Sequence, residues 1–157
     1  ITQEHKMASQ YPADMDRRKQ SMMKLQALVQ TRTETLSLLA DLAGRQPFSP
    51  DPEVEDTLRR FCQALMDYAA SAHFQLYRYI ADNRERRQSV IAVAERIYPR
   101  IVETTDVILR FNDKYESMSL ENSVEFLDVD LSSLGETLAE RIQLEDQVIS
   151  AMGGGVH

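Results

Sequence analysis

Four polar residues that could take part in chemistry fall on otherwise apolar helical stripes: Arg32, His73, Asn112 and Glu145. Burial of a carboxylate among apolar neighbours costs free energy unless a base or a hydrogen-bond donor pairs with it. The candidate partners of Glu145 are Arg141, one turn earlier on the same helix, and Arg32 or His73 across the fold. We therefore expect a buried polar network with a structural role. Its functional alternative is a water-filled cavity that changes shape when a partner binds.

A metal centre is the sharper chemical alternative, because helical bundles can hold di-iron sites with Glu-x-x-His pairs on facing helices. That pair is missing, and His73 is the only histidine outside the ends of the chain. Cys62 falls on an apolar stripe, no serine has the glycines of a nucleophile elbow, and there is no phosphate-binding glycine loop. The sequence therefore predicts no enzyme, no metal and no cofactor. A small-molecule or metal-binding bundle, with Glu145, His73 and Arg32 lining a cavity, is kept as an alternative function.

A second set of side chains lies on the outer face of the segment Phe61–Ile80. At about 100° per residue, half a turn from the apolar stripe brings together six residues: Gln63, Asp67, Ala70, Ser71, Phe74 and Arg78. Small residues let a partner approach closely, Phe74 offers an apolar anchor, and Asp67 offers a charge for a basic group. This face is predicted to bind a partner. The competing interpretation is that Phe74 packs against another helix of the same chain.

Composition favours a single soluble domain that acts on proteins. The chain has 157 residues, 43% of them hydrophobic, and a net charge of −7. The acidic balance argues against nucleic acid as the direct partner, and a basic protein surface is the more natural target. No apolar run reaches the roughly 20 residues that span a bilayer, and the amino end has no apolar signal segment. A lone cysteine fits a reducing compartment, so we expect a cytoplasmic protein without membrane contact.

The amino-terminal third predicts an arm followed by a helix. Residues 1–14 are polar, contain Pro12 and show no period, so we expect a mobile arm before a single domain over residues 15–152. From about Asp16 to Gly44 the sequence reads as a helix. Its expected inward stripe contains Leu25, Leu28, Val29, Leu36, Leu39 and Ala43, with Arg32 in its middle. Met22 and Met23 are more often gap-fillers than a contact surface.

Three further helices complete the expected fold. The proline-rich connector 44–52 precedes a helix that Asp51 or Ser49 can cap and that runs to about Ala81. A charged break over residues 83–87 follows, and its arginines make a poor nucleic-acid patch. The third helix spans about Arg87 to Tyr115 and bends at Pro99, and the last starts at Asn122 or Ser123. The tail 153–157 should be disordered. We predict an all-α, up-down-up-down four-helix bundle with a proline-kinked third helix.

Several segments carry a resemblance to a known family. They are LAGRQPF (42–48), FCQALMDY followed by HF (61–74), FNDKY (111–115) and LSSLGETLAERIQLEDQVI (131–149). In order and over most of the chain, they resemble the Rsd/AlgQ family of bacterial anti-sigma factors. The resemblance implies a helical protein without a catalytic site. It implies binding to the housekeeping sigma subunit of RNA polymerase, over the promoter-reading helices of its C-terminal domain, which favours alternative sigma factors.

The resemblance also points to particular residues. The family's run of Asp-Tyr, any residue, then Ser-Ala-Gly-His-Phe falls on residues 67–74, where Asp67, Tyr68, His73 and Phe74 match. The family's Ser-Ala-Gly is replaced by residues 70–72, Ala-Ser-Ala, which are also small. It implies that Asp67 accepts a bond from a sigma arginine and that Phe74 fills an apolar pocket. The first helix departs from the family, because Asp-Arg-Trp-Leu is replaced by Gln26 to Val29. A helical adaptor for another basic protein is therefore a further alternative.

Overall fold

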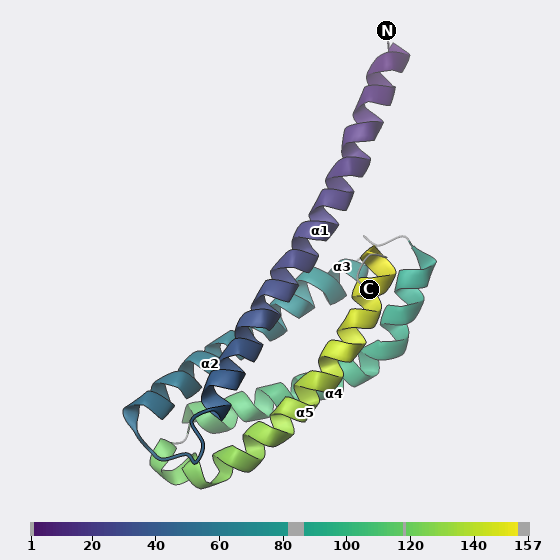
Figure 1. The fold of residues 1–157 in the computed structure, drawn as a ribbon. Helices are drawn as coiled ribbons and strands as arrows, with labels where there is room; N and C mark the ends of the chain where they lie inside the picture. The colour runs from purple at the N-terminus through teal and green to yellow at the C-terminus, as the bar shows by residue number, and fades with distance from the viewer. Residues whose placement is uncertain (1, 82–86, 118, 154–157) are drawn as a thin grey trace.

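The computed structural model describes residues 2–81, 87–117 and 119–153, and side chains from residue 22 onward with Lys19, except that of Tyr79. Its helical elements are α1 (Thr2–Ala43), α2 (Pro52–Ala72), the π-helical turn η1 (His73–Tyr77), α3 (Arg78–Ala81), α4 (Gln88–Ser117) and α5 (Leu120–Gly153). Short connectors make successive helices antiparallel, and the described chain contains no strand. The predicted up-down-up-down four-helix bundle is confirmed (Figure 1).

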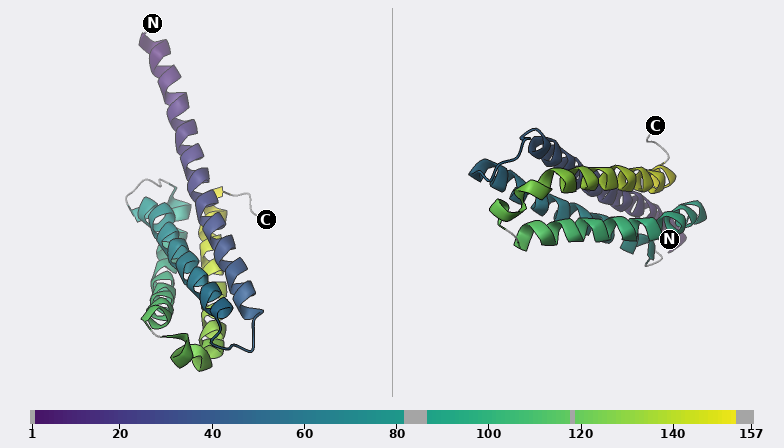
Figure 2. Two further views of the ribbon diagram at one scale, coloured as in Figure 1. Left: turned by 90° about the vertical axis from the view of Figure 1, so that its left-hand side faces the viewer. Right: turned by 90° about the horizontal axis from the view of Figure 1, so that it is seen from below.

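The helices form a closed ring in which each packs against the next. α1 packs on α2, α2 on α4, α4 on α5, and α5 returns to α1. α2, η1 and α3 follow one another as a single rod, so they act as one wall of the bundle (Figure 2). The apolar stripes predicted for the second, third and last helices supply the core. Its buried members include Leu58, Phe61, Leu65, Leu76, Val90, Ala94, Ile97, Ile101, Ile108, Leu127, Leu131, Leu134, Leu138 and Ile149.

The inward stripe of α1 differs from the prediction. Its fully buried side chains are Leu28, Thr35 and Leu42, seven residues apart, whereas Val29 and Leu36 are each 38% exposed. The predicted stripe missed this seven-residue spacing because its middle member, Thr35, is polar. Its hydroxyl donates to the carbonyls of Thr31, at 2.8 Å, and Ala64 of α2, at 3.1 Å, which satisfies the group inside the helix contact.

The amino end of α1 also begins earlier than expected. The helix starts at Thr2 and its upper part extends beyond the bundle (Figure 1). Helix propagation adds one backbone hydrogen bond per residue once a packed section has nucleated it, so a segment without apolar period can continue a helix. Residues 2–14 are thus helical in the structure, and the mobility of the amino-terminal segment stays a prediction. Met22 and Met23, 60% and 59% exposed, do not fill gaps in the core.

The ends of α2 and α5 follow local chemistry. Asp51 caps α2 by accepting from the backbone N–H of Val54 at 2.9 Å, and Pro52 follows in the first turn. This backbone hydrogen bond lowers the pKa of Asp51. α5 begins at Leu120, earlier than predicted, because Ser119 supplies the first carbonyl, which accepts from the N–H of Asn122 at 3.1 Å. The predicted break at 83–87 and tail at 153–157 lie almost entirely outside the described residues.

Two helix irregularities lie on facing helices: the π-helical turn η1 and Pro99 inside α4. In η1 the N–H of Arg78 donates to the carbonyl of His73, five residues earlier, so the turn holds one residue more than an α-helical turn. Tyr77, the last residue of η1, is buried with 6% of its surface exposed. Pro99 lies inside α4 on the exposed side, as predicted.

Candidate functional site: a buried polar network and an exposed helix face

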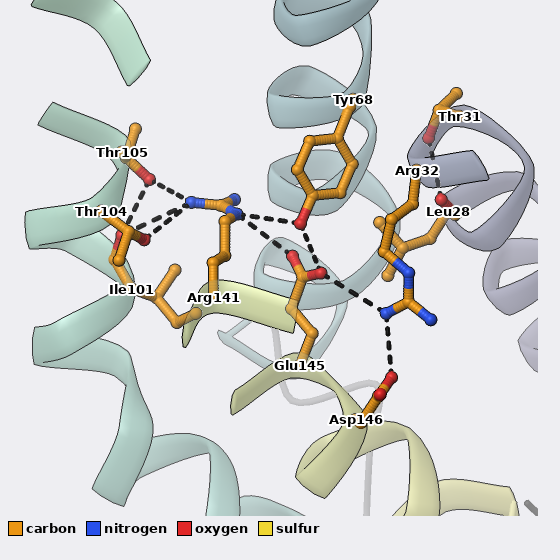
Figure 3. Close-up of polar contacts among 10 residues, drawn as sticks. All are labelled: Leu28, Thr31, Arg32, Tyr68, Ile101, Thr104, Thr105, Arg141, Glu145 and Asp146. Carbon is orange, nitrogen blue, oxygen red and sulfur yellow. Dashed lines mark hydrogen bonds and ion pairs between the residues drawn. The ribbon is translucent and has the colours of Figure 1, made fainter. Parts of the chain in front are cut away.

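The centre of the bundle contains a buried arginine on α5. Arg141 is 1% exposed. Its Nε donates to the hydroxyl of Tyr68 and to Oε2 of Glu145, both at 3.2 Å. Its Nη1 donates to the hydroxyls of Thr105 at 2.8 Å and Thr104 at 3.2 Å (Figure 3). The guanidinium therefore joins α2, α4 and α5 through one side chain.

Glu145 is the acid that balances this arginine. It is fully buried, and its Oε1 accepts from the Tyr68 hydroxyl at 2.5 Å. Oε1 also lies 3.8 Å from Nη1 of Arg32, which itself donates to Asp146 at 2.9 Å (Figure 3). Arg32 is 16% exposed, so its head reaches the edge of the bundle while it still faces the buried acid. The network thus includes a residue from each of the four long helices.

Burial and charge set the protonation of the network. Burial raises the pKa of Glu145, and the nearby Arg141 charge opposes that rise. Burial also raises the pKa of Tyr68, and the neighbouring Glu145 carboxylate raises it further, so the tyrosine stays a neutral donor. Burial tends to lower the pKa of Arg141, but its neighbours outweigh burial and the pKa is raised. The arginine is therefore the permanent charge of the site.

Only part of the predicted network assembles. Arg32 and Glu145 meet, whereas His73 and Asn112 do not join them. His73 is exposed, and its ring centroid lies 5.0 Å from that of Phe74. It is the first residue of η1, where the regular α-helical spacing of about 100° per residue ends. Asn112 is half-buried and donates to Glu116 at 3.2 Å, at the edge of α4.

Sequence reasoning missed three members of the network. Tyr68, Thr104 and Thr105 supply the hydroxyls that complete the hydrogen bonding of the buried pair. The useful signal was Arg141 one turn before Glu145, because an acid and a base four apart inside an apolar stripe require further donors and acceptors on facing helices. Tyrosine and threonine pairs on the inner sides of neighbouring helices are the residues to look for.

The predicted outer face runs from α2 through η1 to α3, and most of its residues are exposed. Asp67 is exposed and its Oδ1 accepts from Gln63 at 3.1 Å. Phe74 is 54% exposed, and the guanidinium of Arg78 lies 5.8 Å from its ring centroid. Ala70 is exposed and Ser71 half-buried between them. Phe74 is therefore not part of the buried core.

The described residues offer little for catalysis or metal binding. Cys62 is buried, and burial raises the pKa of its thiol to about 11, which leaves almost no thiolate at neutral pH. Within the described ranges, no group of three His, Cys, Asp or Glu side chains could hold a metal ion. None of the helices in this part of the chain is long and apolar enough to cross a bilayer.

Comparisons with known proteins agree with the resemblance carried by the sequence motifs. The family model described as "Regulator of RNA polymerase sigma(70) subunit, Rsd/AlgQ" matches residues 7–153. A protein named Regulator of sigma D from Pectobacterium carotovorum is 31% identical over 126 residues, which cover 77% of this chain and 82% of that protein. No solved structure matches the chain.

Two Yersinia proteins named Regulator of sigma D are also similar. The one from Yersinia enterocolitica is 36% identical over 101 residues, 62% of this chain and 60% of that protein. The one from Yersinia pestis is 37% identical over 96 residues, 59% of this chain and 56% of that protein. These matches span less than two thirds of the Yersinia proteins' length.

Proposed function

Because this chain belongs to the family of regulators of the RNA polymerase sigma(70) subunit, Rsd/AlgQ, we propose that it is an anti-sigma factor. It binds the C-terminal, promoter-reading domain of the housekeeping sigma subunit in the cytoplasm. While bound, that domain is unable to contact promoter DNA, and polymerase becomes available to alternative sigma factors. The protein acts by occupancy, one copy per sigma, and needs no chemical step.

The observation that carries the proposal is the open outer face of α2. The phenyl ring of Phe74 is 54% exposed, and the exposed carboxylate of Asp67 lies seven residues before it. Asp67 lies in α2 and Phe74 in the adjoining η1, and both side chains are exposed. An aromatic anchor beside a charge is a common arrangement in binding hot spots.

Charge supports the choice of partner. Helices that read promoter DNA carry basic residues for phosphate and base contacts. A protein with a net charge of −7 attracts such a surface, and Asp67 offers an arginine a hydrogen-bonding carboxylate. Binding of the same basic residues by protein and by DNA is mutually exclusive, which gives the competitive mechanism.

The sequence of α1 affects which residues contribute to the proposed sigma contact. Where the family has Asp-Arg-Trp-Leu, this chain has Gln26 to Val29, and Leu28 within that run is fully buried. Only Gln26 and Val29 of the run are exposed on α1. We propose that α1 contributes less to the sigma contact here than in other family members, so that binding depends more strongly on Asp67 and Phe74.

Calorimetric titration with the isolated C-terminal domain of the housekeeping sigma tests the proposal. We expect one-to-one binding that Asp67→Ala and Phe74→Ala each weaken by about 2 kcal/mol or more, as for hot-spot residues. The matched controls are Asp106→Ala and Phe126→Ala, which remove an exposed acid from α4 and a 46% exposed phenyl ring from α5.

The control variants separate the possible outcomes. Loss of binding in the α2 variants alone supports the outer face as the interface. Equal weakening in all four variants would contradict an interface confined to the outer face. Absence of binding by the unmodified protein would overturn the sigma proposal and favour an adaptor for another basic protein.

A further inference from the structure

A row of exposed apolar side chains runs along one flank of α4. Its members are Tyr98, Val102 and Leu109, which are 45%, 44% and 39% exposed. They are four and seven residues apart, close to whole helical turns, so they lie on one side of the helix. Single exposed apolar residues are common on protein surfaces, whereas a contiguous patch marks a site of contact. The row is therefore a candidate docking surface.

Each end of the row reaches a pocket that α4 shares with the wall formed by α2, η1 and α3. The upper pocket lies between η1 and α4, has a volume of about 600 Å³ and includes Tyr98 in its lining. The lower pocket lies between α2, α4 and the start of α5, has a volume of about 610 Å³ and is lined by Met66 and Asn112 among others. Val102 and Leu109 come between Tyr98 and Asn112 along α4. The row therefore follows the seam between α2 and α4 from one pocket to the other.

Acidic side chains border the same row. Glu95, Asp106 and Asp113 are exposed on α4. At about 100° per residue, all three lie within about 40° of Val102 around the helix. None of the three forms an ion pair with another described residue. A partner with basic side chains beside its apolar face is complementary to this border.

The basic side chains that line the two pockets already have partners. In the lower pocket, Arg59 donates to Glu55 at 2.9 Å. In the upper pocket, the guanidinium of Arg78 lies 5.8 Å from the ring centroid of Phe74. Glu116 adds a further exposed acid to the lower pocket. Acidic charge therefore predominates along the seam.

The shape of the seam fits a helix. The described chain has no strand, so it offers no sheet edge to which a partner strand is added. Tyr98 and Asn112 are 14 positions apart, about 21 Å along the axis at about 1.5 Å per residue. An amphipathic helix of four turns covers that length, and its apolar face packs along the seam between two helices.

We propose that the seam between α2 and α4 docks a basic amphipathic helix of a partner protein, about four turns long. The apolar face of that helix packs on Tyr98, Val102 and Leu109 and places a large side chain in each pocket. Its flanking lysines and arginines pair with the acids of α4. Asp67 and Phe74 line neither pocket, so this surface is separate from the proposed sigma interface and does not depend on it.

Three synthetic peptides of about 14 residues test the proposal. The first has leucines three and four residues apart and lysines elsewhere, so it forms a basic amphipathic helix. The second keeps the leucines and replaces the lysines by glutamates, and the third scrambles the first so that no apolar face forms. Binding to the full chain is followed by amide chemical shifts in NMR titrations. We expect the first peptide to shift the amides of Val102 and Leu109 and to bind about tenfold more tightly than the others.

Matched variants locate the contact. Leu109→Ser should weaken the basic amphipathic peptide about five- to tenfold, as expected for truncation of an interface anchor. Its control is Val129→Ser, which removes a 71% exposed side chain from α5 and should leave the affinity unchanged. Glu95→Gln should weaken the peptide and lower the salt dependence of its binding, whereas Glu136→Gln, an exposed site on α5, should do neither.

A last variant separates this proposal from the sigma proposal. Asp67→Ala should leave peptide binding unchanged, whatever its effect on the sigma domain, so either proposal can fail without the other. Thermal melts check that every variant is folded. Absence of binding by the basic amphipathic peptide, equal binding of the acidic or the scrambled peptide, or equal losses in Leu109→Ser and Val129→Ser would overturn the docking surface.

Discussion

Two buried tyrosines on one wall of the bundle have opposite surroundings. Tyr68 of α2 is fully buried, donates to Glu145 and accepts from Arg141. Tyr77 of η1, nine residues later, is almost as buried, yet its hydroxyl is unpaired in the described chain. The first lies where four helices contribute polar groups to one network. The second is the last residue of the π-helical turn, and it makes no hydrogen bond to that network.

The difference shows which of the two buried hydroxyls the stability of the fold depends on. The lower network makes each member depend on the others, because an unpaired charge in the core is costly. The hydroxyl of Tyr77 has no partner in the described chain, so no other polar group depends on it. Four measurements test this contrast, in order of decreasing expected effect.

The largest effect should come from Glu145→Leu. It leaves Arg141, 1% exposed, without its buried acid, and we expect a loss of about 3–5 kcal/mol in the free energy of unfolding. Adding Arg141→Met should recover most of that loss, because a buried ion pair can often be replaced by apolar residues of similar size. Urea denaturation of both single variants and the double variant measures the coupling, and additive losses would show that the pair is not coupled.

A smaller effect is expected from Tyr68→Phe. It removes the donor to Glu145 and the acceptor for Arg141 while it retains the ring, and we expect a loss of about 1–3 kcal/mol. Thermal unfolding followed by circular dichroism is sufficient to measure it. A change below about 0.5 kcal/mol would mean that the network readily substitutes water for this hydroxyl.

The pH dependence of stability should identify Glu145. Its pKa is raised by burial above the usual 4.5, so the native state holds this proton more tightly than the unfolded state. The resulting stabilisation is fully present below pH 4.5 and is lost as pH rises through the pKa of the folded state. Glu145→Gln removes this contribution.

Urea unfolding of the native protein and Glu145→Gln between pH 4.5 and 8 measures the effect. The stability advantage of the native protein over the variant should shrink as pH rises. An advantage that grows with pH would instead mean that the arginines lower the pKa of Glu145 in the folded state.

The smallest effect should come from Tyr77→Phe, which completes the comparison with Tyr68. Removal of a hydroxyl that has no partner should change the free energy of unfolding by less than about 0.5 kcal/mol, or raise it slightly. The same denaturation experiment that is used for Tyr68→Phe provides the control. Equal losses in the two variants would show that both hydroxyls are satisfied in solution.

Features that depend on spacing within one helix were predicted from the sequence, whereas features that depend on contacts between helices were not. The Asp51 cap and the stripes of α4 and α5 were predictable, because spacing along one helix determines them. His73 was misplaced: it begins the π-helical turn and is exposed, whereas a stripe position alone predicted it to be buried. The stripe of α1 was misread because Thr35 is buried by a hydrogen bond to a neighbouring helix, which the sequence of α1 alone does not reveal.

The candidate sites divide in the same way. Exposure of Asp67 and Phe74 was predictable from the helical wheel, and Arg141 was recognised as a partner for Glu145 because both are on one helix. Tyr68 and the threonines of α4 were missed because they reach the buried pair from other helices. The pocket between η1 and α4 depends on a helix irregularity and on packing between two walls, so no sequence pattern indicated it.

The bond between Arg32 and Asp146 has a consequence for the order of folding. Its two residues are separated by 114 positions, whereas α1 with α2, and α4 with α5, are joined by short connectors. Bringing distant segments together costs more chain entropy than forming a helical hairpin. We therefore expect the two hairpins to assemble first, and the seam between the first and last helices to close late in the transition.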